Sequence, residues 1–297
     1  MKISILGTNG FLSTAIATYY SKDGVELNMY GLEKPKLHNY TQFNPIDLTK
    51  EDLEYSSLCD SDIIIYAIGA GIQSNLHESN ELIYNLNVTT PVKICNKLKE
   101  NQYKGIFVTF GSVFELGATS QLYYATENDI LKSDNPVPND YSVSKRMLTR
   151  FVSSYKKDFT HWHFFIPTIY GEYENPMRLI PYTINSILRN NSPLHFTAGD
   201  QVRQYIYVSE VPRLIDLAYQ KCLASGLYNI QGMETMTVKE IVSIIHAALG
   251  KELPSDCFGK AQRNDVSMKY LALDGSKLKQ AIGFEAQIKL TDIINKY

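Results

Sequence analysis

The amino-terminal stretch MKISILGTNGFLS, residues 1–13, joins a short apolar strand to a helix through a turn with two glycines. The strand covers residues 2–6, the turn begins at Gly7, and the helix is expected to reach Tyr20. A glycine turn at this point lets backbone N–H groups approach a pyrophosphate at the helix N-terminus. The stretch therefore indicates either a dinucleotide-binding site or a tight strand-to-helix turn that binds nothing.

Strand and helix alternate at short spacing through the first half of the chain. The apolar strands are typical of parallel strands that are buried on both faces. The further strands are expected at residues 25–30, 42–46, 62–67, 106–110 and 163–166, and the helices at 50–58, 81–100 and from Tyr141 onward. The pattern predicts an α/β fold with a Rossmann-type doubly wound parallel sheet.

The pattern changes after Pro167, where Pro, Gly and Asn become frequent. We expect a smaller C-terminal α+β lobe that covers the carboxyl edge of the sheet. Its helices are expected near residues 177–189, 211–224, 238–249 and 276–282. The predicted domains are a dinucleotide-binding domain at residues 1–166, to which residues 205–230 return, and a substrate-binding lobe at residues 167–204 and 231–297.

The composition argues against several classes of partner. The chain has 297 residues, enough for a large core, and a formal net charge of -2 at pH 7. A pI of about 6.3 without a long basic run makes nucleic acid and anionic membranes poor partners. No apolar stretch approaches the roughly 18 residues of a membrane span, and the first residues lack a signal-peptide layout. We therefore expect a cytoplasmic protein.

The four cysteines are scattered along the chain and have no clustered histidine partners. They are Cys59, Cys95, Cys222 and Cys257. This spacing is typical of reduced, mostly buried thiols, and we expect no metal site.

Residues 138–146, PNDYSVSKR, place a tyrosine and a lysine four residues apart at the start of a helix. Asn139 or Asp140 can cap the helix, and residues four apart share a helical face. The Lys145 ammonium would then lie beside the Tyr141 phenol and lower its pKa towards neutrality, which suits a general acid or base. The alternative is a surface pair on an amphipathic helix.

The end of the second strand bears on the choice of dinucleotide. An NAD-binding site usually has an acidic residue there to bind the ribose hydroxyls. This chain has Gly31, followed by Lys34 and Lys36. The residues favour NADP(H), with NAD(H) as the alternative, although lysines in a loop are usually only solvated.

In this order the motifs resemble the extended short-chain dehydrogenases/reductases, the NAD-dependent epimerase/dehydratase family that acts on nucleotide sugars. The resemblance runs nearly end to end. It is carried by the glycine turn, Asp47-Leu48, Asn87-Val88, Tyr141 with Lys145, Ile169-Tyr170-Gly171 and residues 202–208, 262–266 and 273–277. Residues 87–91, 199–203 and 258–263 are most similar to nucleotide-sugar 4-ketoreductases such as the CDP-abequose and CDP-paratose synthases.

The resemblance implies a cofactor site that runs along the carboxyl ends of the strands. Its residues would be Gly7, Thr8, Asn9, Gly10, Phe11, Leu12, Asp47, Leu48, Ala67, Ile68, Gly69, Asn87, Tyr141, Lys145, Pro167 and Ile169. The family has a third glycine where this chain has Ser13, whose side chain is small enough to keep helix and strand close.

The resemblance also implies substrate contacts from Thr168, Arg203 and Arg263. The two guanidinium groups would hold the phosphates of a sugar nucleotide, for which their planar, bidentate geometry is suited. A surface ion pair is the alternative for either arginine.

The family's third catalytic group is a Ser or Thr hydroxyl that hydrogen-bonds the substrate oxygen. An alignment without a gap places Phe110 there, and a phenyl ring cannot form that bond. Ser112 is the favoured replacement and Thr109 the other nearby hydroxyl. Sugar 4,6-dehydratases carry an Asp-Glu pair where Gly111 and Ser112 stand, so the resemblance disfavours dehydration.

The main hypothesis is an NADP(H)-dependent reductase that converts a nucleotide-diphosphate 4-keto sugar to the alcohol, in the biosynthesis of a surface-polysaccharide sugar. The alternatives are a nucleotide-sugar 4-epimerase that retains NAD and a non-catalytic dinucleotide-binding protein. The resemblance further implies a homodimer that forms through the helices at residues 81–100 and 141–155.

Overall fold

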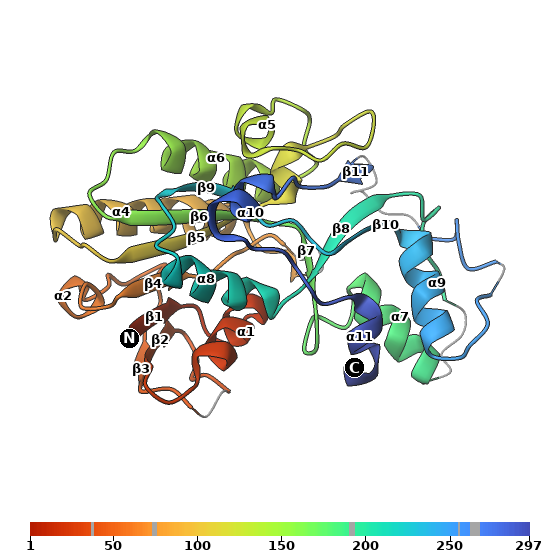
Figure 1. Cartoon of the computed structure of the whole chain (residues 1–297), viewed down its shortest axis with the longest axis horizontal. Helices are drawn as coiled ribbons and strands as arrows, with labels where there is room; N and C mark the ends of the chain where they lie inside the picture. Colours follow the sequence, from red (N-terminus) through yellow and green to blue (C-terminus); the bar gives the residue numbers. More distant parts are fainter. Residues whose placement is uncertain (37–38, 73–75, 190–193, 255, 262–267) are drawn as a thin grey trace.

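The computed structural model describes residues 1–36, 39–72, 76–189, 194–254, 256–261 and 268–297. Its centre is a seven-stranded sheet in the order β3-β2-β1-β4-β5-β6-β9, in which neighbouring strands are parallel (Figure 1). The strands are β1 Lys2–Leu6, β2 Glu26–Gly31, β3 Gln42–Pro45, β4 Ile63–Tyr66, β5 Ile106–Ser112, β6 Thr160–Ile166 and β9 Gly226–Asn229. The predicted doubly wound α/β sheet is confirmed.

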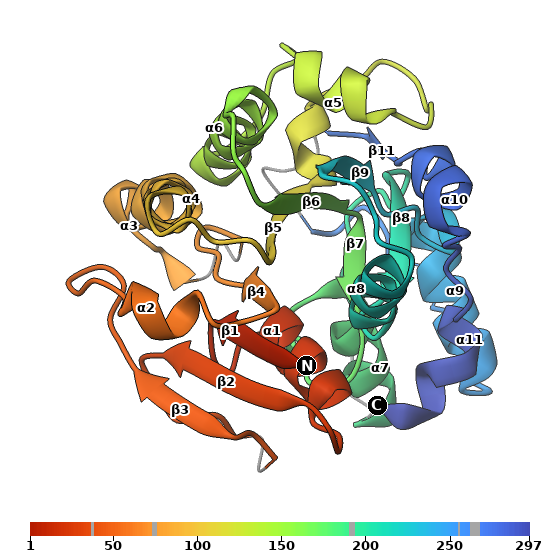
Figure 2. The ribbon, with the colours of Figure 1, turned by 60° about the vertical axis from the view of Figure 1, so that its left-hand side comes forward.

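Both faces of this sheet are covered by helices (Figure 2). Successive strand residues point to opposite faces, so Ile63 and Ile65 pack with α1 and α8 while Ile64 packs with α4. The helices of the first part are α1 Phe11–Tyr20, α2 Tyr55–Leu58, α3 Asn80–Tyr84, α4 Thr90–Glu100, α5 Glu127–Lys132 and α6 Asp140–Ser154, and α8 is Glu210–Gln220. Burial on both faces is why a central strand such as β4 is apolar throughout.

A second, four-stranded sheet lies beyond the carboxyl edge of the first and has its own apolar core. Its strands are β7 Thr168–Tyr170, β8 Val202–Tyr207, β10 Glu234–Thr237 and β11 Tyr270–Leu271, and the remaining helices are α7 Leu179–Leu188, α9 Val238–Ala248, α10 Ser276–Ile282 and α11 Leu290–Ile293. Of the segment expected to return to the first lobe, β9 joins β6 whereas the end of β8 lies in the second sheet. We keep the division into two lobes as a proposal.

Two of the expected helices differ from the structure. The helix predicted at residues 50–58 is limited to α2, because the Asp47 side chain accepts the Thr49 N–H at 3.0 Å and closes a turn before it. The helix predicted at residues 81–100 is divided by a π-helical turn, Asn85–Thr89, after which Pro91 lies in the first turn of α4. Proline removes one N–H from the helix, and a π-helical turn directly before it is a common place for such an interruption.

Among the described residues, no helix is both long enough and apolar enough to cross a membrane.

Gly232 lies where the chain passes from the first sheet to the second, and a substitution there tests how closely the backbone packs. A Cβ at this residue would lie 2.8 Å from the Tyr205 carbonyl carbon in β8, a backbone atom that cannot turn aside. We expect Gly232→Ala to lower the free energy of unfolding by about 1–3 kcal/mol through overpacking, measured by urea denaturation. The adjacent exposed Met233, changed to Ala, is the control and should shift stability by no more than about 0.5 kcal/mol. Equal stability of the two variants would contradict this account.

Candidate active site

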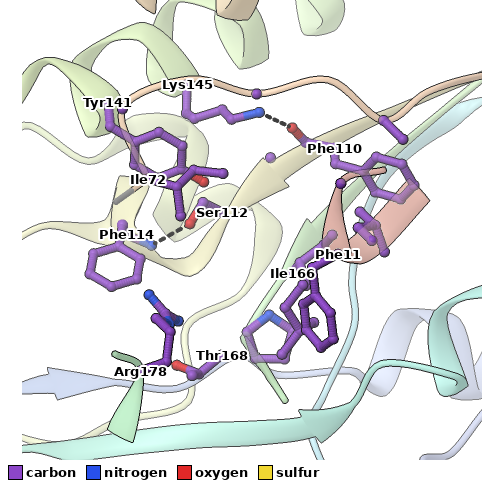
Figure 3. A pocket seen from close by; sticks show the side chains of 18 of the residues that line it. Phe11, Ile72, Phe110, Ser112, Phe114, Tyr141, Lys145, Ile166, Thr168 and Arg178 are labelled. Carbon is purple, nitrogen blue, oxygen red and sulfur yellow. Dashed lines mark hydrogen bonds between the residues drawn. The ribbon is translucent and has the colours of Figure 1, made fainter. Parts of the chain in front are cut away.

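A cavity of about 710 Å³ opens where the carboxyl ends of the parallel strands face the second sheet. Ligands of doubly wound sheets bind in this crevice. The residues that line it are Gly10, Phe11, Leu12, Ala67, Ile68, Gly69, Gly71, Ile72, Phe110, Gly111, Ser112, Phe114, Pro138, Asn139, Tyr141, Lys145, Ile166, Pro167, Thr168, Ile169, Glu174, Asn175 and Arg178. Figure 3 shows Tyr141, Lys145 and Ser112 on one side, with Thr168 and Arg178 across from them.

The glycine turn brings backbone close to the floor of this cavity. Gly7 has a φ of 119°, and a Cβ on it would lie 3.3 Å from the Ala67 carbonyl oxygen. Gly10 caps α1 without a side-chain hydrogen bond, so the N-terminus of this helix is open to a ligand. Ser13 is buried and its hydroxyl donates to the Gly10 carbonyl at 3.0 Å, so the serine fits in place of a third glycine. These residues fit a dinucleotide pyrophosphate.

The other predicted cofactor residues fall into two groups. Ala67, Ile68, Gly69, Pro167 and Ile169 line the cavity together with Gly10, Phe11 and Leu12, whereas Gly7, Thr8, Asn9, Asp47, Leu48 and Asn87 are not among its lining residues. Leu48 instead lines a smaller cavity of about 280 Å³. The Asp47 carboxylate is engaged by Lys50 at 2.9 Å.

Asn87 supports the cavity wall from behind. It is fully buried in the π-helical turn, where its Oδ1 accepts the Ala70 N–H at 3.0 Å and its Nδ2 donates to Ser144 at 2.9 Å. The amide thereby joins the loop after β4 to α6. Asn87 is therefore a structural support of the wall in this structure.

Tyr141 and Lys145 enter the cavity from the first turns of α6. Asn139 caps this helix by accepting the Ser142 N–H at 3.0 Å. The Lys145 Nζ lies 5.8 Å from the centre of the Tyr141 ring and donates to the Phe110 carbonyl at 2.9 Å. The pair is therefore part of the cavity wall and not a surface pair on an amphipathic helix.

The pKa of Tyr141 differs from the sequence-based expectation. Burial raises it to about 12, although a hydrogen bond with Ser112 acts in the opposite direction and the charge of Glu115 adds to the rise. Burial also lowers the pKa of Lys145 to about 8, against the attraction of Glu115. The expected depression of the Tyr141 pKa by Lys145 is wrong for this structure, because desolvation dominates and the cation that lowers this pKa is Arg178 instead of Lys145.

Ser112 and Thr109 point in different directions from β5. Ser112 lines the cavity, interacts with Tyr141 and accepts the Phe114 N–H at 3.2 Å. Thr109 is fully buried and bonds His161 and His163, each at 2.8 Å, on the face covered by α6. The structure does not bring Thr109 to the cavity, and Ser112 is the hydroxyl available there.

The predicted substrate residues have different locations. Thr168 lines the cavity, and Arg263 lies outside the described residues. Arg203 is largely buried in β8, where its Nη1 donates to the backbone carbonyls of Val202 at 2.9 Å and Lys269 at 3.2 Å. Arg203 is not among the residues that line the cavity.

Arg178 is a charged cavity residue that sequence reasoning missed. Its Nε donates to the Glu174 carboxylate at 3.1 Å. Arg178, Glu174 and Asn175 all line the cavity from the loop after β7. The Glu174 side chain is only 6% exposed, and burial raises its pKa to about 7. The available sequence signal was a charged segment directly after Ile169-Tyr170-Gly171.

Within the described part of the chain, no three His, Cys, Asp or Glu side chains are grouped to hold a metal ion.

The sequence matches the family model described as "NAD dependent epimerase/dehydratase family" over residues 3–230. The chain belongs to this family.

The proteins that this chain resembles in sequence or in fold have several different activities. dTDP-glucose 4,6-dehydratase 1 of Escherichia coli (strain K12) is 26% identical over 188 residues, which are 58% of this chain and 49% of that protein. The chain thus spans about half the length of this relative. MoeE5 in complex with UDP-glucuronic acid and NAD has a TM-score of 0.83 at 18% identity, with 99% and 97% of the two chains covered. The UDP-glucose 4-epimerase of Thermus thermophilus, in complex with NAD, has a TM-score of 0.82 at 18% identity, covering 99% and 96%.

The raised pKa of Glu174 predicts a pH-dependent stability. Its carboxyl binds more protons in the folded than in the unfolded chain between its ordinary pKa of 4.5 and about 7, so stability falls as the pH rises through this range. Glu174→Gln removes the titration, and its stability relative to the natural chain should rise by about 3 kcal/mol over that range in urea denaturation. Glu33→Gln, at an exposed carboxylate, is the matched control for the loss of one carboxylate charge. A stability difference between Glu174→Gln and the natural chain that stays constant over this pH range would refute the raised pKa of Glu174.

Proposed function

We propose that this chain is an NADP(H)-dependent reductase of a nucleotide-diphosphate 4-keto sugar. The observation that carries the proposal is the junction of Tyr141, Lys145 and Ser112 at one wall of a cavity that also meets the glycine turn. Because the pKa of Tyr141 is raised to about 12, its phenol keeps its proton at neutral pH and can act as a proton donor.

The residues present fit a nicotinamide dinucleotide. Gly10 to Leu12 would hold its pyrophosphate, and Pro167 and Ile169 would face its nicotinamide. When bound, the cofactor supplies hydride to the carbonyl carbon of the sugar. The remaining chemistry belongs to side chains of this chain.

Tyr141 would donate its proton to the alkoxide oxygen that develops during reduction. Ser112, which interacts with Tyr141, would hold the carbonyl oxygen by a second hydrogen bond and so orient it. Lys145 is fixed by the Phe110 carbonyl and provides positive charge beside the phenol. Placement and electrostatics are therefore what the protein contributes to the reaction.

Dehydration has less support than reduction from the end of β5. Gly111 and Ser112 line the cavity where sugar 4,6-dehydratases carry an Asp-Glu pair, and Glu174 is the only carboxylate among the described residues that line it. Glu174 already receives the Arg178 guanidinium. Elimination of water needs an acid and a base on the sugar, so we rank it below reduction.

Epimerisation is the second candidate. It would use the same Tyr141, Lys145 and Ser112 with a retained cofactor. The NAD-bound epimerase structure with the same fold favours keeping this alternative.

The substrate end of the proposal rests on the loop after β7. Arg178 and Asn175 face the cavity beside Thr168, and a guanidinium suits the phosphates of a sugar nucleotide. The dehydratase and epimerase relatives carry dTDP-glucose and UDP-glucose in their names. We propose that Arg178 is the phosphate contact within the described residues. Arg203 would instead stabilise β8 through its hydrogen bonds to backbone carbonyls.

We also propose a cytoplasmic homodimer that acts in the biosynthesis of a surface-polysaccharide sugar. The dimer would pair α6 and the helices at residues 81–100 with those of a second copy. Val143 and Met147 expose apolar surface on α6, 37% and 48% respectively, which suits such a contact.

Tyr141→Phe tests the proposed proton donor. The variant should lose at least about 100-fold in reduction of 4-keto sugars by NADPH, because general-acid catalysis is worth about that much. Its NADPH affinity, measured by fluorescence titration, should be nearly unchanged. Tyr84→Phe, which removes a phenol bonded to Asp140 at 2.8 Å on a neighbouring helix, is the matched control and should keep turnover. Turnover retained by Tyr141→Phe across CDP-, dTDP-, GDP- and UDP-4-keto sugars would reject the assignment.

The cofactor preference is tested at the loop after β2. Asn9 ties this loop to the glycine turn, as its Nδ2 donates to the Lys34 carbonyl at 3.1 Å and its Oδ1 accepts the Lys36 N–H at 2.9 Å. A Cβ on Gly31 would lie 2.5 Å from the Thr8 hydroxyl, so an acidic side chain has little room there.

We expect the natural chain to bind NADPH more tightly than NADH. The double variant Lys34→Ala/Lys36→Ala should weaken NADPH about tenfold or more, since a hydrogen bond to a charged group contributes roughly 1.5–3 kcal/mol, and should leave NADH unchanged. Lys22→Ala, at an exposed lysine after α1, serves as the control. Tighter NADH binding, or NAD that co-purifies and is retained, would favour the epimerase.

A further inference from the structure

A continuous row of buried hydrogen bonds runs behind the cavity, between β5, β6, α4 and α6. The row links Cys95 to His161 at 3.7 Å, His161 to Thr109 at 2.8 Å, Thr109 to His163 at 2.8 Å, His163 to Thr149 at 3.0 Å and Thr149 to Glu115 at 2.6 Å. The exposed fraction of each of these side chains is 1% or less. The row ends at the carboxyl of Glu115, beneath the catalytic wall.

The chemistry of the two ends gives the row a direction. An ionised Glu115 can only accept, so the Thr149 hydroxyl donates to it and must itself accept from His163 Nε2–H. The unprotonated Nδ1 of His163 then accepts the Thr109 hydroxyl hydrogen. By the same reasoning Thr109 accepts from His161 Nε2–H, and His161 Nδ1 accepts from the Cys95 thiol.

Protonation of Glu115 reverses every one of these bonds. The acid then donates to Thr149, whose hydroxyl turns to His163 Nε2, so that each histidine carries its hydrogen on Nδ1. In this reversal each hydrogen moves to the next atom towards Glu115: Thr149 protonates the carboxylate, each imidazole gives its Nε2 hydrogen to one hydroxyl, and its Nδ1 receives a hydrogen from the neighbour on the other side. A proton taken up at the Cys95 thiol replaces the one that the thiol gives to His161, so the row gains one proton and that proton is carried by Glu115.

Both histidines stay neutral, as the reversal of the row requires. Burial lowers the pKa of His163 to about 3, with Lys145 and Lys157 adding to the effect. Burial likewise lowers the pKa of His161 well below its ordinary value. A neutral imidazole has one donor and one acceptor nitrogen, so the direction of the hydrogen bond on one side of the ring fixes the direction on the other side.

Glu115 lies in contact with the catalytic wall. Its Oε1 accepts the Ser112 N–H at 2.7 Å, and a Cβ on Gly111 would lie 2.7 Å from both this oxygen and His163 Nε2. The missing side chain of Gly111 thus leaves the space that the carboxyl occupies. Ser112 and Glu115 also form a capping box at the turn after β5.

The charges around Glu115 come mainly from α6. Lys145 and Arg146 lower its pKa, while burial raises it to about 7 and so dominates. Its own charge raises the pKa values of Tyr141 and Lys145 in return. His163 faces it from β6; α5 and β11 also pack against this turn, and none of their described groups is among those that shift its pKa.

We propose that Glu115 is a positioning residue, whose carboxylate orients Ser112 by accepting the Ser112 backbone N–H. Protonation of Glu115 reverses the direction of the hydrogen bonds in the row from Thr149 to Cys95. Its effect on catalysis, exerted through Lys145 and Tyr141, rests on the proposed function. The reversal of the row does not.

The test is the tautomer of each histidine, read from long-range ¹H–¹⁵N correlation spectra of the full chain. His161→Gln and His163→Gln assign the signals. In the natural chain, both histidines should change from the Nε2–H to the Nδ1–H form as the pH falls through about 7. Glu115→Gln keeps an oxygen for the Ser112 N–H and supplies an N–H to Thr149, so it should hold both histidines in the Nδ1–H form at every pH.

Two further variants make the test specific. Thr149→Val removes the hydroxyl that joins Glu115 to His163, and should abolish the pH dependence of both tautomers. This variant tests the row independently if Glu115→Gln fails to fold. Glu174→Gln removes the other buried carboxyl whose pKa is raised to about 7 but which lies outside the row, and should leave the tautomers as in the natural chain. Nε2–H histidines in Glu115→Gln, or the same switch in Thr149→Val, would overturn the proposal.

A second readout separates this proposal from the proposed function. With a 4-keto sugar that is reduced, Glu115→Gln should shift the alkaline loss of kcat to lower pH, because the charge that raises the pKa of Lys145 is gone. Glu115→Asp should restore the alkaline limb in part. An unshifted limb overturns the catalytic role of Glu115. If no sugar is reduced, the proposed function fails while the tautomer result, which needs no substrate, still decides the row.

Discussion

The hydrogen bond from the Lys145 ammonium to the Phe110 carbonyl is the contact on which the geometry of the site depends. A buried cation is costly unless polar groups replace its water. This carbonyl lies near the carboxyl end of β5, so the contact fixes α6 against the central sheet at one point. Tyr141 lies one turn earlier on the same helix and is thereby brought to Ser112. One satisfied charge therefore locates a proton donor, a hydroxyl and a cation together.

The same buried region contains an opposite charge, Glu115, and the two influence each other. Burial raises the pKa of the acid and lowers that of the lysine, while their attraction opposes both changes. Desolvation favours neutral forms and attraction favours ions, so the balance is sensitive to small changes near neutral pH. A carboxyl of this kind also explains why Gly111 has no side chain, since a Cβ there would meet Glu115 and His163.

The fold could be predicted because its signal is local. Apolar runs such as Ile63–Tyr66 are buried on both faces, and a glycine turn follows the first strand. The choice between Thr109 and Ser112 needed the phase of β5, which extends to Ser112 and so places Ser112 on the same face as Phe110. The role of Arg178 depends on its pairing with Glu174 and on the path of a loop, which no periodicity encodes. Burial of Tyr141, which reversed the expected pKa shift, is likewise a property of the packed structure.

That reversal bears on the direction of the reaction. A phenol with a pKa of about 12 holds its proton throughout the physiological range. It can give a proton to an alkoxide as soon as one forms, which is the step that reduction of a ketone requires. To accept a proton from a sugar hydroxyl, as oxidation requires, it must first lose its own, at a cost of about 1.4 kcal/mol for each unit between its pKa and the pH. The raised pKa of Tyr141 therefore supports its role as the proton donor in the proposed reduction, a step that an epimerase would also take after its oxidation.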